Sequence, residues 1–275
     1  PGFKPKPDFL GNNADLSAPG YGFILGDQNP SYRYDAAKNG WLANDSRMNN
    51  AFAQNIQERI NGTVTIDPIE DLRIVLTVER SNQRNISSIF RYNDLDSSFK
   101  DFGFQESGTF STSYGTWNTA FSPENSDGIS QVFRQFEQNR KEISERLAIE
   151  KFGSTQGLAR DSFGYVIGYS KTSQDVLIPA FLAAYSGTNV NAVDLSPFPK
   201  LPIPNWSVNY NGLSKLKFVK NWASDIALSH RYSSTYTVGN FLTPSAINRD
   251  TAAGVTDFLS QFIIRTVSIT ERFAP

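Results

Sequence analysis

The chain has 275 residues but no cysteine and only one histidine. Without cysteine it can form no disulfide, no thiolate metal site and no cysteine nucleophile. The single histidine, His230, excludes any site that needs two histidine ligands. A serine hydrolase triad would have to use Ser229 or Asp225, yet strand residues of opposite parity point to opposite faces. We therefore expect no enzyme, and we expect His230 to be a structural residue of an aromatic girdle or an interface.

The chain also lacks a strong net charge and a long apolar run. Its formal charge of -1 gives no global attraction to nucleic acid or to anionic membrane surfaces, so no nucleic-acid partner is expected. Mean hydropathy is -0.38, and no run approaches the ~18 apolar residues that mark a transmembrane helix. The low hydropathy does not exclude membrane strands, because only every second residue of a barrel strand faces lipid and the strand is polar on average.

Phosphate-binding and metal-binding motifs are missing as well. Gly20, Gly22 and Gly26 have neither the dinucleotide nor the phosphate-loop spacing, and no lysine follows Gly26. Asp94 and Asp96 have the first spacing of a calcium loop without the remaining ligands. The sequence therefore predicts no cofactor and no metal.

What the chain does contain is alternation of apolar and polar side chains. In the stretch from Asp225 to Phe241 five large apolar residues fall on even positions and mainly small or polar residues on odd ones, which predicts a strand with two different faces. The stretch exceeds the roughly 9–11 residues that a tilted strand needs to cross a bilayer. The even, apolar set is Ile226, Leu228, Tyr232, Tyr236 and Val238, and the odd, polar set includes Arg231, Ser233 and Thr235.

A second alternating segment predicts a β-hairpin. Val64 and Ile66 alternate with threonines before the turn at residues 68–71, and the alternation resumes after it. After the turn the apolar set is Leu72, Ile74, Leu76 and Val78, and the polar set includes Arg73, Thr77 and Glu79. Further strands are expected at 108–119, 206–210 and 261–272. In the last of these both phases mix apolar and polar residues, so the sequence does not assign its faces.

Two helices are expected between the strands. The first is predicted from Gly128 to about Phe152 with Asp127 as its cap, because its apolar residues fall on one stripe. The second is predicted from about Gln174 to Tyr185, with a capping box at Thr172 and Asp175, a break at Pro179 and an end near Gly187. We divide the chain into an irregular cap or loop region (1–60), a hairpin and strand (61–122), a helical insertion (123–200) and C-terminal strands (201–275), joined by long loops rich in proline and glycine.

Long segments of the chain match the pattern of one known family. They are YGFILGDQ (Tyr21 to Gln28), AAKNGWLANDSRMNNAF (Ala36 to Phe52), the hairpin TIDPIEDLRIVLTVER (Thr65 to Arg80), DVLIPAFLAAYSG (Asp175 to Gly187), FPKLPIPNWSVNYNGLSKL (Phe198 to Leu216), LSHRYSSTYTVGNF (Leu228 to Phe241) and ITERFAP (Ile269 to Pro275). These segments resemble, in the same order, the SprA/Sov family, the outer-membrane translocon of the bacterial type IX secretion system. The resemblance extends over most of this chain but over only a small part of a family member, so the chain is expected to be a fragment of a larger protein.

The resemblance implies a very large single-chain β-barrel in the outer membrane of a Bacteroidetes-type bacterium, through which folded cargo proteins leave for secretion and gliding motility. It also implies a FadL-like barrel partner and a plug protein. The five or six strands expected here are too few for even the smallest barrel of about eight, so they must pair with the remainder of the parent barrel. We therefore predict a mainly β, antiparallel transmembrane barrel segment with two inserted helices, which narrow or cap the pore or dock partners on it.

In such a segment the apolar sets named above face lipid or a partner. The polar sets face a water-filled lumen, and their members are Arg73, Thr77, Glu79, Arg231, Ser233 and Thr235. Ordinary exposure of these polar residues on a soluble sheet remains the other interpretation. The alternative from a different class is a soluble, β-rich extracellular domain that binds glycans or acts as an adhesin. Its binding residues would be the tryptophans Trp41, Trp117, Trp206 and Trp222.

Overall fold

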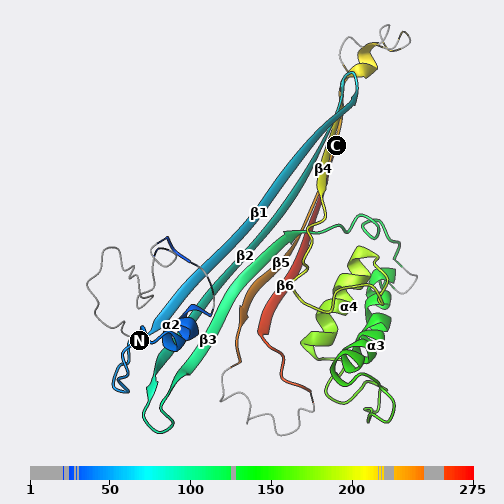
Figure 1. Ribbon diagram of the computed structural model, residues 1–275. Helices are drawn as coiled ribbons and strands as arrows, with labels where there is room; N and C mark the ends of the chain where they lie inside the picture. Colours follow the sequence, from blue (N-terminus) through cyan, green and yellow to red (C-terminus); the bar gives the residue numbers. More distant parts are fainter. Residues whose placement is uncertain are drawn as a thin grey trace. The chain divides into compact units, whose positions relative to one another are not determined.

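The computed structural model of the chain describes residues 21, 25–27, 29, 31–124, 128–215, 217, 219, 226–244 and 257–275. In this part of the chain six strands form one antiparallel sheet, and three α-helices accompany them (Figure 1). The mainly β class with two helices inserted between the strands is therefore confirmed. The strands are β1 (Phe52–Ile69), β2 (Leu72–Asn93), β3 (Ser98–Ser113), β4 (Asn205–Tyr210), β5 (Leu228–Leu242) and β6 (Ile263–Ala274).

The strands follow the order β1-β2-β3-β5-β4, with β6 on the other side of β5 and with an additional pairing of β2 with β4. The chain divides into two compact units. One consists of residues 1–57 and 83–108, and the other of residues 58–82 and 109–275.

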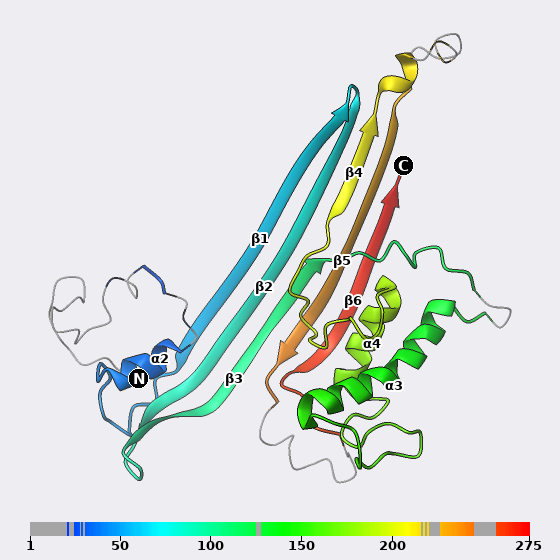
Figure 2. The same cartoon turned by 45° about the vertical axis from the view of Figure 1, so that its right-hand side comes forward.

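Strands β3 and β4 occupy one position in the sheet, one after the other. Both lie between β2 and β5, as Figure 2 shows. The Tyr114 N–H donates to the Ser234 carbonyl (3.1 Å), and the Ile203 N–H donates to the Ser113 carbonyl (3.0 Å). Residues 114–204 therefore leave the sheet at the end of β3 and return to the same position at the start of β4. The helical segment is an insertion into a single interrupted strand.

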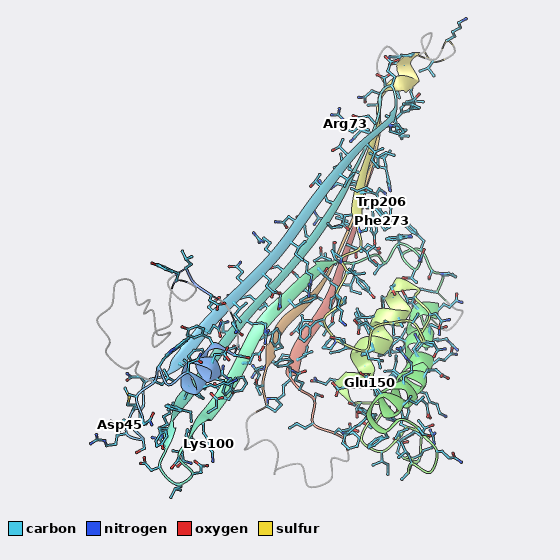
Figure 3. All side chains as sticks on the ribbon, viewed as in Figure 1. Asp45, Arg73, Lys100, Glu150, Trp206 and Phe273 are labelled. Atoms are coloured by element: carbon cyan, nitrogen blue, oxygen red, sulfur yellow. The ribbon has the colours of Figure 1, made fainter. Side chains whose placement is uncertain are left out.

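The predicted hairpin is confirmed as β1 and β2, joined by a turn at Glu70 and Asp71, where Asp71 has φ 66°. Its strands are longer than the alternation indicated, with 18 residues in β1 and 22 in β2. Arg73 lies near the turn end of the hairpin (Figure 3). The sequence pattern fades after Arg80 because the apolar phase of β2 becomes charged and polar, but the neighbouring strands β1 and β3 keep this part of β2 in the sheet.

The first inserted helix, α3 (Gln131–Phe152), lies close to its predicted range. Its N-cap is Ser130, whose Oγ accepts a hydrogen bond from the Val132 N–H (3.2 Å). Its end is set by Gly153, which adopts the left-handed conformation with φ 78°. The predicted cap, Asp127, lies outside the described residues.

The second inserted helix, α4 (Gln174–Ser186), corrects two predictions. Pro179 lies inside the helix and does not break it. The cost of a missing N–H is offset by burial, because the helix is nearly covered on all sides, with Val176, Ala180 and Leu182 at most 1 % exposed. The capping box is also wrong, since the N-cap is Ser173 and its side chain makes no cap hydrogen bond. The predicted end at Gly187, with φ 67°, is confirmed.

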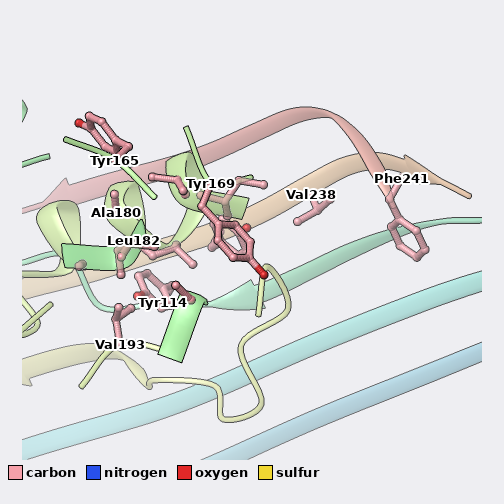
Figure 4. Packing of buried hydrophobic residues seen from close by; sticks show 14 of the residues in the cluster. Tyr114, Tyr165, Tyr169, Ala180, Leu182, Val193, Val238 and Phe241 are labelled. Atoms are coloured by element: carbon pink, nitrogen blue, oxygen red, sulfur yellow. The ribbon is translucent and has the colours of Figure 1, made fainter. Parts of the chain in front are cut away.

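The main hydrophobic core joins the two inserted helices to one face of the sheet (Figure 4). From the helices it contains residues such as Ile143 and Leu182, and from the sheet Phe110, Tyr236 and Val238. All five are at most 1 % exposed. The even-numbered, apolar phase of β5 therefore packs against the chain's own helices along this part of the strand.

The alternation of β5 changes phase at Gly239. Val238 is paired with Val267, but Phe241 is paired with Ile264, with register shifts in between. A β-bulge of this kind places one extra residue in a strand and turns the following side chains to the other parity. Both Val238 and Phe241 are therefore buried although one is even and the other odd. A second register shift, which skips Arg265 between Thr266 and Ile264, changes the parity of β6 and explains why its sequence mixes the two phases.

The other unit contains a short helix, α2 (Tyr32–Lys38), in a region predicted to be irregular. Arg33 on this helix is only 5 % exposed and forms an ion pair with Asp101 (3.0 Å). Ala36 and Leu42 pack with Phe90, which is fully buried. The sequence did not predict this helix, because it has no apolar stripe of its own. It is held instead by the Arg33–Asp101 ion pair and by packing against Phe90.

The core of the helical insertion can be tested at Tyr236, which is 0 % exposed and donates through its hydroxyl to the Pro197 carbonyl (2.9 Å). We expect Tyr236→Ala to lower the free energy of unfolding by about 3–5 kcal/mol, because it leaves a cavity. Tyr236→Phe should cost about 1–3 kcal/mol through the unsatisfied carbonyl. Urea unfolding of the chain in detergent, followed by circular dichroism, measures both.

The matched control is Thr235→Ala, next in sequence and exposed on the other face. It should change the free energy of unfolding by less than about 0.5 kcal/mol. Equal losses at residues 235 and 236 would contradict the packing described.

Candidate functional site

The register of the strands sorts the predicted site residues onto two faces of one sheet. Leu76 pairs with Trp206, and Trp206 pairs with Tyr232. Directly paired residues of antiparallel strands point to the same side. The apolar phase of the hairpin and the apolar phase of β5 therefore share one face, which we call the apolar face. The polar phases of the same strands share the opposite face, which we call the polar face.

The same register assigns the faces of β6, which the sequence left open. Tyr232 pairs with Phe273, and Tyr236 pairs with Ile269. Val267, Ile269, Glu271 and Phe273 consequently lie on the apolar face. Ser268, Thr270, Arg272 and Ala274 lie on the polar face with Arg231 and Thr235.

The apolar face has an open part and a covered part. In the open part Leu72, Ile74, Leu76, Val78 and Ile226 are half-exposed and Leu228 is 57 % exposed. In the covered part Tyr232, Tyr236 and Val238 are 0 % exposed. We predicted lipid or a partner against all of these residues. For the last three the prediction is corrected, because the chain's own insertion fills that space.

The polar face is open along its length within this chain. Arg73, Glu79, Arg231 and Thr235 are exposed, and Thr77 and Ser233 are half-buried. Arg73 forms an ion pair with Asp67 (3.0 Å) in which both side chains are more than half exposed. Such an exposed pair contributes little to stability, and both charged groups remain in contact with water. The face carries hydroxyl, amide and charged groups that suit contact with water.

Side chains replace the missing backbone pairing at the point where β3 gives way to β4. The Ser234 N–H donates to the Asn205 side-chain oxygen (2.8 Å), and the Glu79 N–H donates to Ser113 Oγ (3.3 Å). Buried backbone groups are expensive to leave unpaired. A short polar residue at each cut end of the strand therefore lets the ladder continue across the interruption.

A buried cluster of hydroxyl groups lies beside this interruption. Tyr232 Oη accepts a hydrogen bond from the Thr116 N–H (2.8 Å) and donates to Glu271 Oε1 (2.8 Å). Thr116 Oγ1 donates to the same carboxylate oxygen (2.5 Å) and lies 3.1 Å from Ser234 Oγ. Tyr232, Thr116 and Ser234 are each at most 3 % exposed. The cluster ties the start of the insertion to β5 and β6.

Aromatic rings surround the cluster. Trp206 stacks on Tyr232 with centroids 4.3 Å apart and planes 24° apart, and Phe273 lies 4.9 Å from Tyr232. From the insertion, Trp117 packs edge-on to Trp206 at 5.2 Å, and Phe121 lies 5.0 Å from Phe273. Figure 3 shows Trp206 and Phe273 close together beside the insertion. Gly115 is required here, because an added Cβ would lie 2.2 Å from the Trp117 ring.

Sequence reasoning did not find this cluster. Thr116 and Glu271 are 155 positions apart, and neither belongs to an alternating stretch with an assigned face. The only signal was the presence of Trp117 and Trp206, which we had considered as glycan-binding residues. In the structure one ring face of Trp206 is occupied by Tyr232. Trp41 packs near Tyr32 in the other unit, and Trp222 lies outside the described residues.

His230 is exposed on the apolar face, with its ring centroid 6.4 Å from Trp206 and 6.3 Å from Phe273. This agrees with the predicted place of His230 among aromatic residues. Ser229 lies on the opposite face, and Asp225 lies outside the described residues. Asp96 pairs with Lys100 at the turn that joins β2 and β3. Within the described ranges no group of three or more acidic or histidine side chains could hold a metal ion.

The insertion contains a cavity of about 570 Å³ between its two helices, the loop at 193–200 and the start of β6. Its lining includes Arg146, Asp175 and Lys200. Arg146 donates to the carbonyls of Val190 (2.6 Å) and Val193 (3.0 Å), so its guanidinium holds the loop rather than pointing to a ligand. Burial raises the pKa of the Asp175 carboxyl above its ordinary value.

No helix in the part of the chain that the structure describes is both long enough and apolar enough to span a membrane. A scan against protein-family models gives no match, and no curated protein is significantly similar to the chain.

The hydroxyl cluster can be tested at Glu271. We expect Glu271→Ala to remove the carboxylate that accepts from both the Thr116 and the Tyr232 hydroxyls and to cost about 1–3 kcal/mol of local stability. Hydrogen exchange at the Tyr114 and Thr116 amides should accelerate accordingly. Glu271→Gln keeps an acceptor oxygen and should lose less. Arg272→Ala is the matched control, because Arg272 is exposed on the polar face. An equal effect of the two alanine variants would contradict the role of Glu271 in the hydroxyl cluster.

The raised pKa of Asp175 makes the insertion sensitive to pH. The folded state holds the Asp175 proton to a higher pH than the unfolded state, whose carboxyl titrates near ~3.9. The contribution of Asp175 to the free energy of unfolding is therefore highest below the pKa of the unfolded state. It falls as the pH rises from that pKa to the raised pKa of the folded state. We expect Asp175→Asn to remove this dependence in urea unfolding at pH 4 and pH 7. Asp194→Asn, at an exposed site, should leave it unchanged.

Proposed function

We propose that this chain is part of the wall of a protein-conducting β-barrel in the outer membrane, a passive conduit that exports folded cargo proteins in type IX secretion and gliding motility. One observation carries the proposal. A single register across four strands separates an open apolar surface from an open polar surface. A soluble sandwich buries one face of each sheet against another sheet, and a barrel wall instead presents one face to lipid and one to water.

The free edges of the sheet support a larger barrel. Among the described strands, β1 pairs only with β2, and β6 pairs only with β5. An edge with unpaired backbone groups cannot stand in hydrocarbon, because each unsatisfied group costs several kcal/mol. Six strands are also too few to close a barrel of about eight or more. The remainder of the parent barrel is therefore the proposed partner at both edges.

The polar face is the proposed lining of the conduit. It presents Arg73, Thr77, Glu79, Arg231, Ser233 and Thr235 together with the amide and hydroxyl groups of β4. Side chains of this kind stay hydrated and hold no single ligand, which suits passage of varied folded proteins. Chemistry on the cargo is not proposed, and the driving energy has to come from other components.

The resemblance of the long segments to the SprA/Sov family supports the same function. On this resemblance we propose that the protein lies in the outer membrane of a Bacteroidetes-type bacterium. It also adds a FadL-like barrel and a plug protein as partners that gate the conduit. These partners rest on the resemblance alone.

The proposal is tested by placing single cysteines at Ser207 and Arg231 on the polar face and at Val208 and Leu76 on the apolar face of the full-length protein in cells. We expect a membrane-impermeant maleimide to label the first pair and a lipid-partitioning reagent to label the second, because the two faces meet different solvents. A bulky adduct at Arg231 should also reduce cargo release.

Val208 is the matched control for Ser207, since the two are adjacent in β4 and differ only in face. Equal labelling of both from water would overturn the proposal. A soluble β-rich domain that binds glycans or acts as an adhesin would then replace it.

A further inference from the structure

We infer that the helical insertion lies on the lipid side of the wall, in water just beyond one leaflet, and that the bilayer covers the apolar face between the insertion's aromatic edge and the turn of the β1–β2 hairpin. This inference rests on the proposed function and deepens it. It differs from the expectation that the inserted helices narrow or cap the pore.

The insertion and the open apolar surface are on the same side of the sheet. Tyr232 belongs to the covered part and pairs with Trp206, which is next to the open part. Tyr236 and Val238 follow at the same parity and join the core that contains Ile143 and Leu182. The polar face of these strands remains uncovered within the chain. If the polar face lines the conduit, the insertion is attached to the outer surface of the wall.

The insertion cannot lie within hydrocarbon. The side of α3 that points away from the core carries exposed charges, namely Arg134, Glu137, Lys141, Glu142, Glu150 and Lys151. Ionised side chains at the centre of a bilayer cost several kcal/mol each. The outer surface of the wall therefore leaves the bilayer where the insertion begins.

Two charged layers bound the open apolar surface. At one end are Glu58 on β1, Arg80 on β2 and Glu271 on β6, each at the parity of the apolar face. The Asn82 amide donates to the Glu58 carboxylate (3.3 Å), which shows that these two side chains share a face. At the other end, Lys215 Nζ lies 3.0 Å from Glu70 Oε1 and 2.5 Å from Asp71 Oδ2 at the hairpin turn.

Among the strand residues that the structure describes, those of the apolar face between these layers include no acidic or basic side chain apart from His230. Its exposed members include Ile60 (50 %), Val64 (55 %), Ile66 (42 %) and Leu228 (57 %). From Glu58 to Glu70 the strand rises about 40 Å at ~3.4 Å per residue, and a tilt of ~40° reduces this to about 30 Å along the membrane normal. On β2, from Asp71 to Arg80, the same estimate gives about 24 Å. The two estimates, about 24 Å and about 30 Å, lie on either side of the apolar band of about 25 Å that a transmembrane barrel presents to lipid.

The aromatic edge marks one boundary. Trp117 and Phe121 of the insertion meet Trp206 and Phe273 of the sheet, and Phe121 remains 81 % exposed. Tryptophan and other aromatic rings gather at the level of lipid head groups. The start of the insertion thus rests at the membrane surface, and the charged α3 lies farther out.

The position of the bilayer is tested by introducing arginine at neighbouring residues of opposite face. In full-length protein folded into phosphatidylcholine vesicles, we expect Leu76→Arg to lower the folding equilibrium constant in urea titrations by roughly 30- to 700-fold, since residue 76 lies midway between the two charged layers and the substitution places a charge at mid-bilayer. Val75→Arg is the matched control on the polar face and should stay near wild type. Ile149→Arg, at an exposed position of α3, should also stay near wild type.

The side on which the insertion lies is tested with bulky maleimide-polyethylene glycol in cells. An adduct at Ile149→Cys should leave cargo release unchanged, whereas an adduct at Arg231→Cys should block it. Release that stops with the adduct at residue 149, while Leu76→Arg destabilises the folded protein and Val75→Arg does not, would overturn the inference but leave the conduit intact. Equal effects of arginine at residues 76 and 75, or none at either, would instead overturn the proposed function itself.

Discussion

The pairing of β4 with both β2 and β5 is the constraint on which the rest of the structure depends. Only six residues form this strand, yet they continue the position that β3 leaves. Through Trp206 the pairing aligns Leu76 with Tyr232, so that two segments distant in sequence present their apolar residues to the same side. A slip by one residue would place each apolar residue of β4 on the polar face. The two faces exist because this register is fixed.

The interruption of the strand has physical consequences for the insertion. A segment that leaves and re-enters at one position keeps the sheet continuous, but the interruption removes backbone partners from groups of the neighbouring strands β2 and β5. Asn205 and Ser113 satisfy two of them, and Tyr232 anchors the departing chain through Thr116. The insertion then covers the apolar side chains of β5 that continue past this point. A buried polar network and an adjoining apolar core therefore support each other, because each excludes water from the other.

The proposed conduit would account for the strand lengths, the covering helices and the charged residues on the apolar face. Strands of 18 and 22 residues exceed the length that a bilayer requires, so part of the outer surface must lie in water. Apolar side chains on that part need a cover other than lipid, and the helices provide it for β5 and β6. Charged residues at the apolar-face parity, such as Arg80 and Glu58, are tolerated there for the same reason.

The sequence by itself determined where most strands lie and which residues share a face within each strand, because alternation with a period of two reflects the pleat directly. It also located both inserted helices, the first through its apolar stripe and the second through its apolar run and the glycine that ends it. It did not determine what covers each face, so Tyr232, Tyr236 and Val238 were predicted to face lipid or a partner. Alternation is the same whether an apolar side chain meets hydrocarbon or the chain's own helix.

Only the tertiary structure decided how the elements combine. The hydroxyl cluster joins Thr116 to Glu271, and no local pattern connects residues so far apart. Register shifts at Gly239 and Arg265 change the parity of β5 and of β6, so the faces of β6 could be assigned only from its pairing with β5. The continuity of β3 with β4 depends on backbone pairing with two neighbours at once. Long-range contacts of this kind are chosen by burial and hydrogen bonding in three dimensions, which a single sequence does not display.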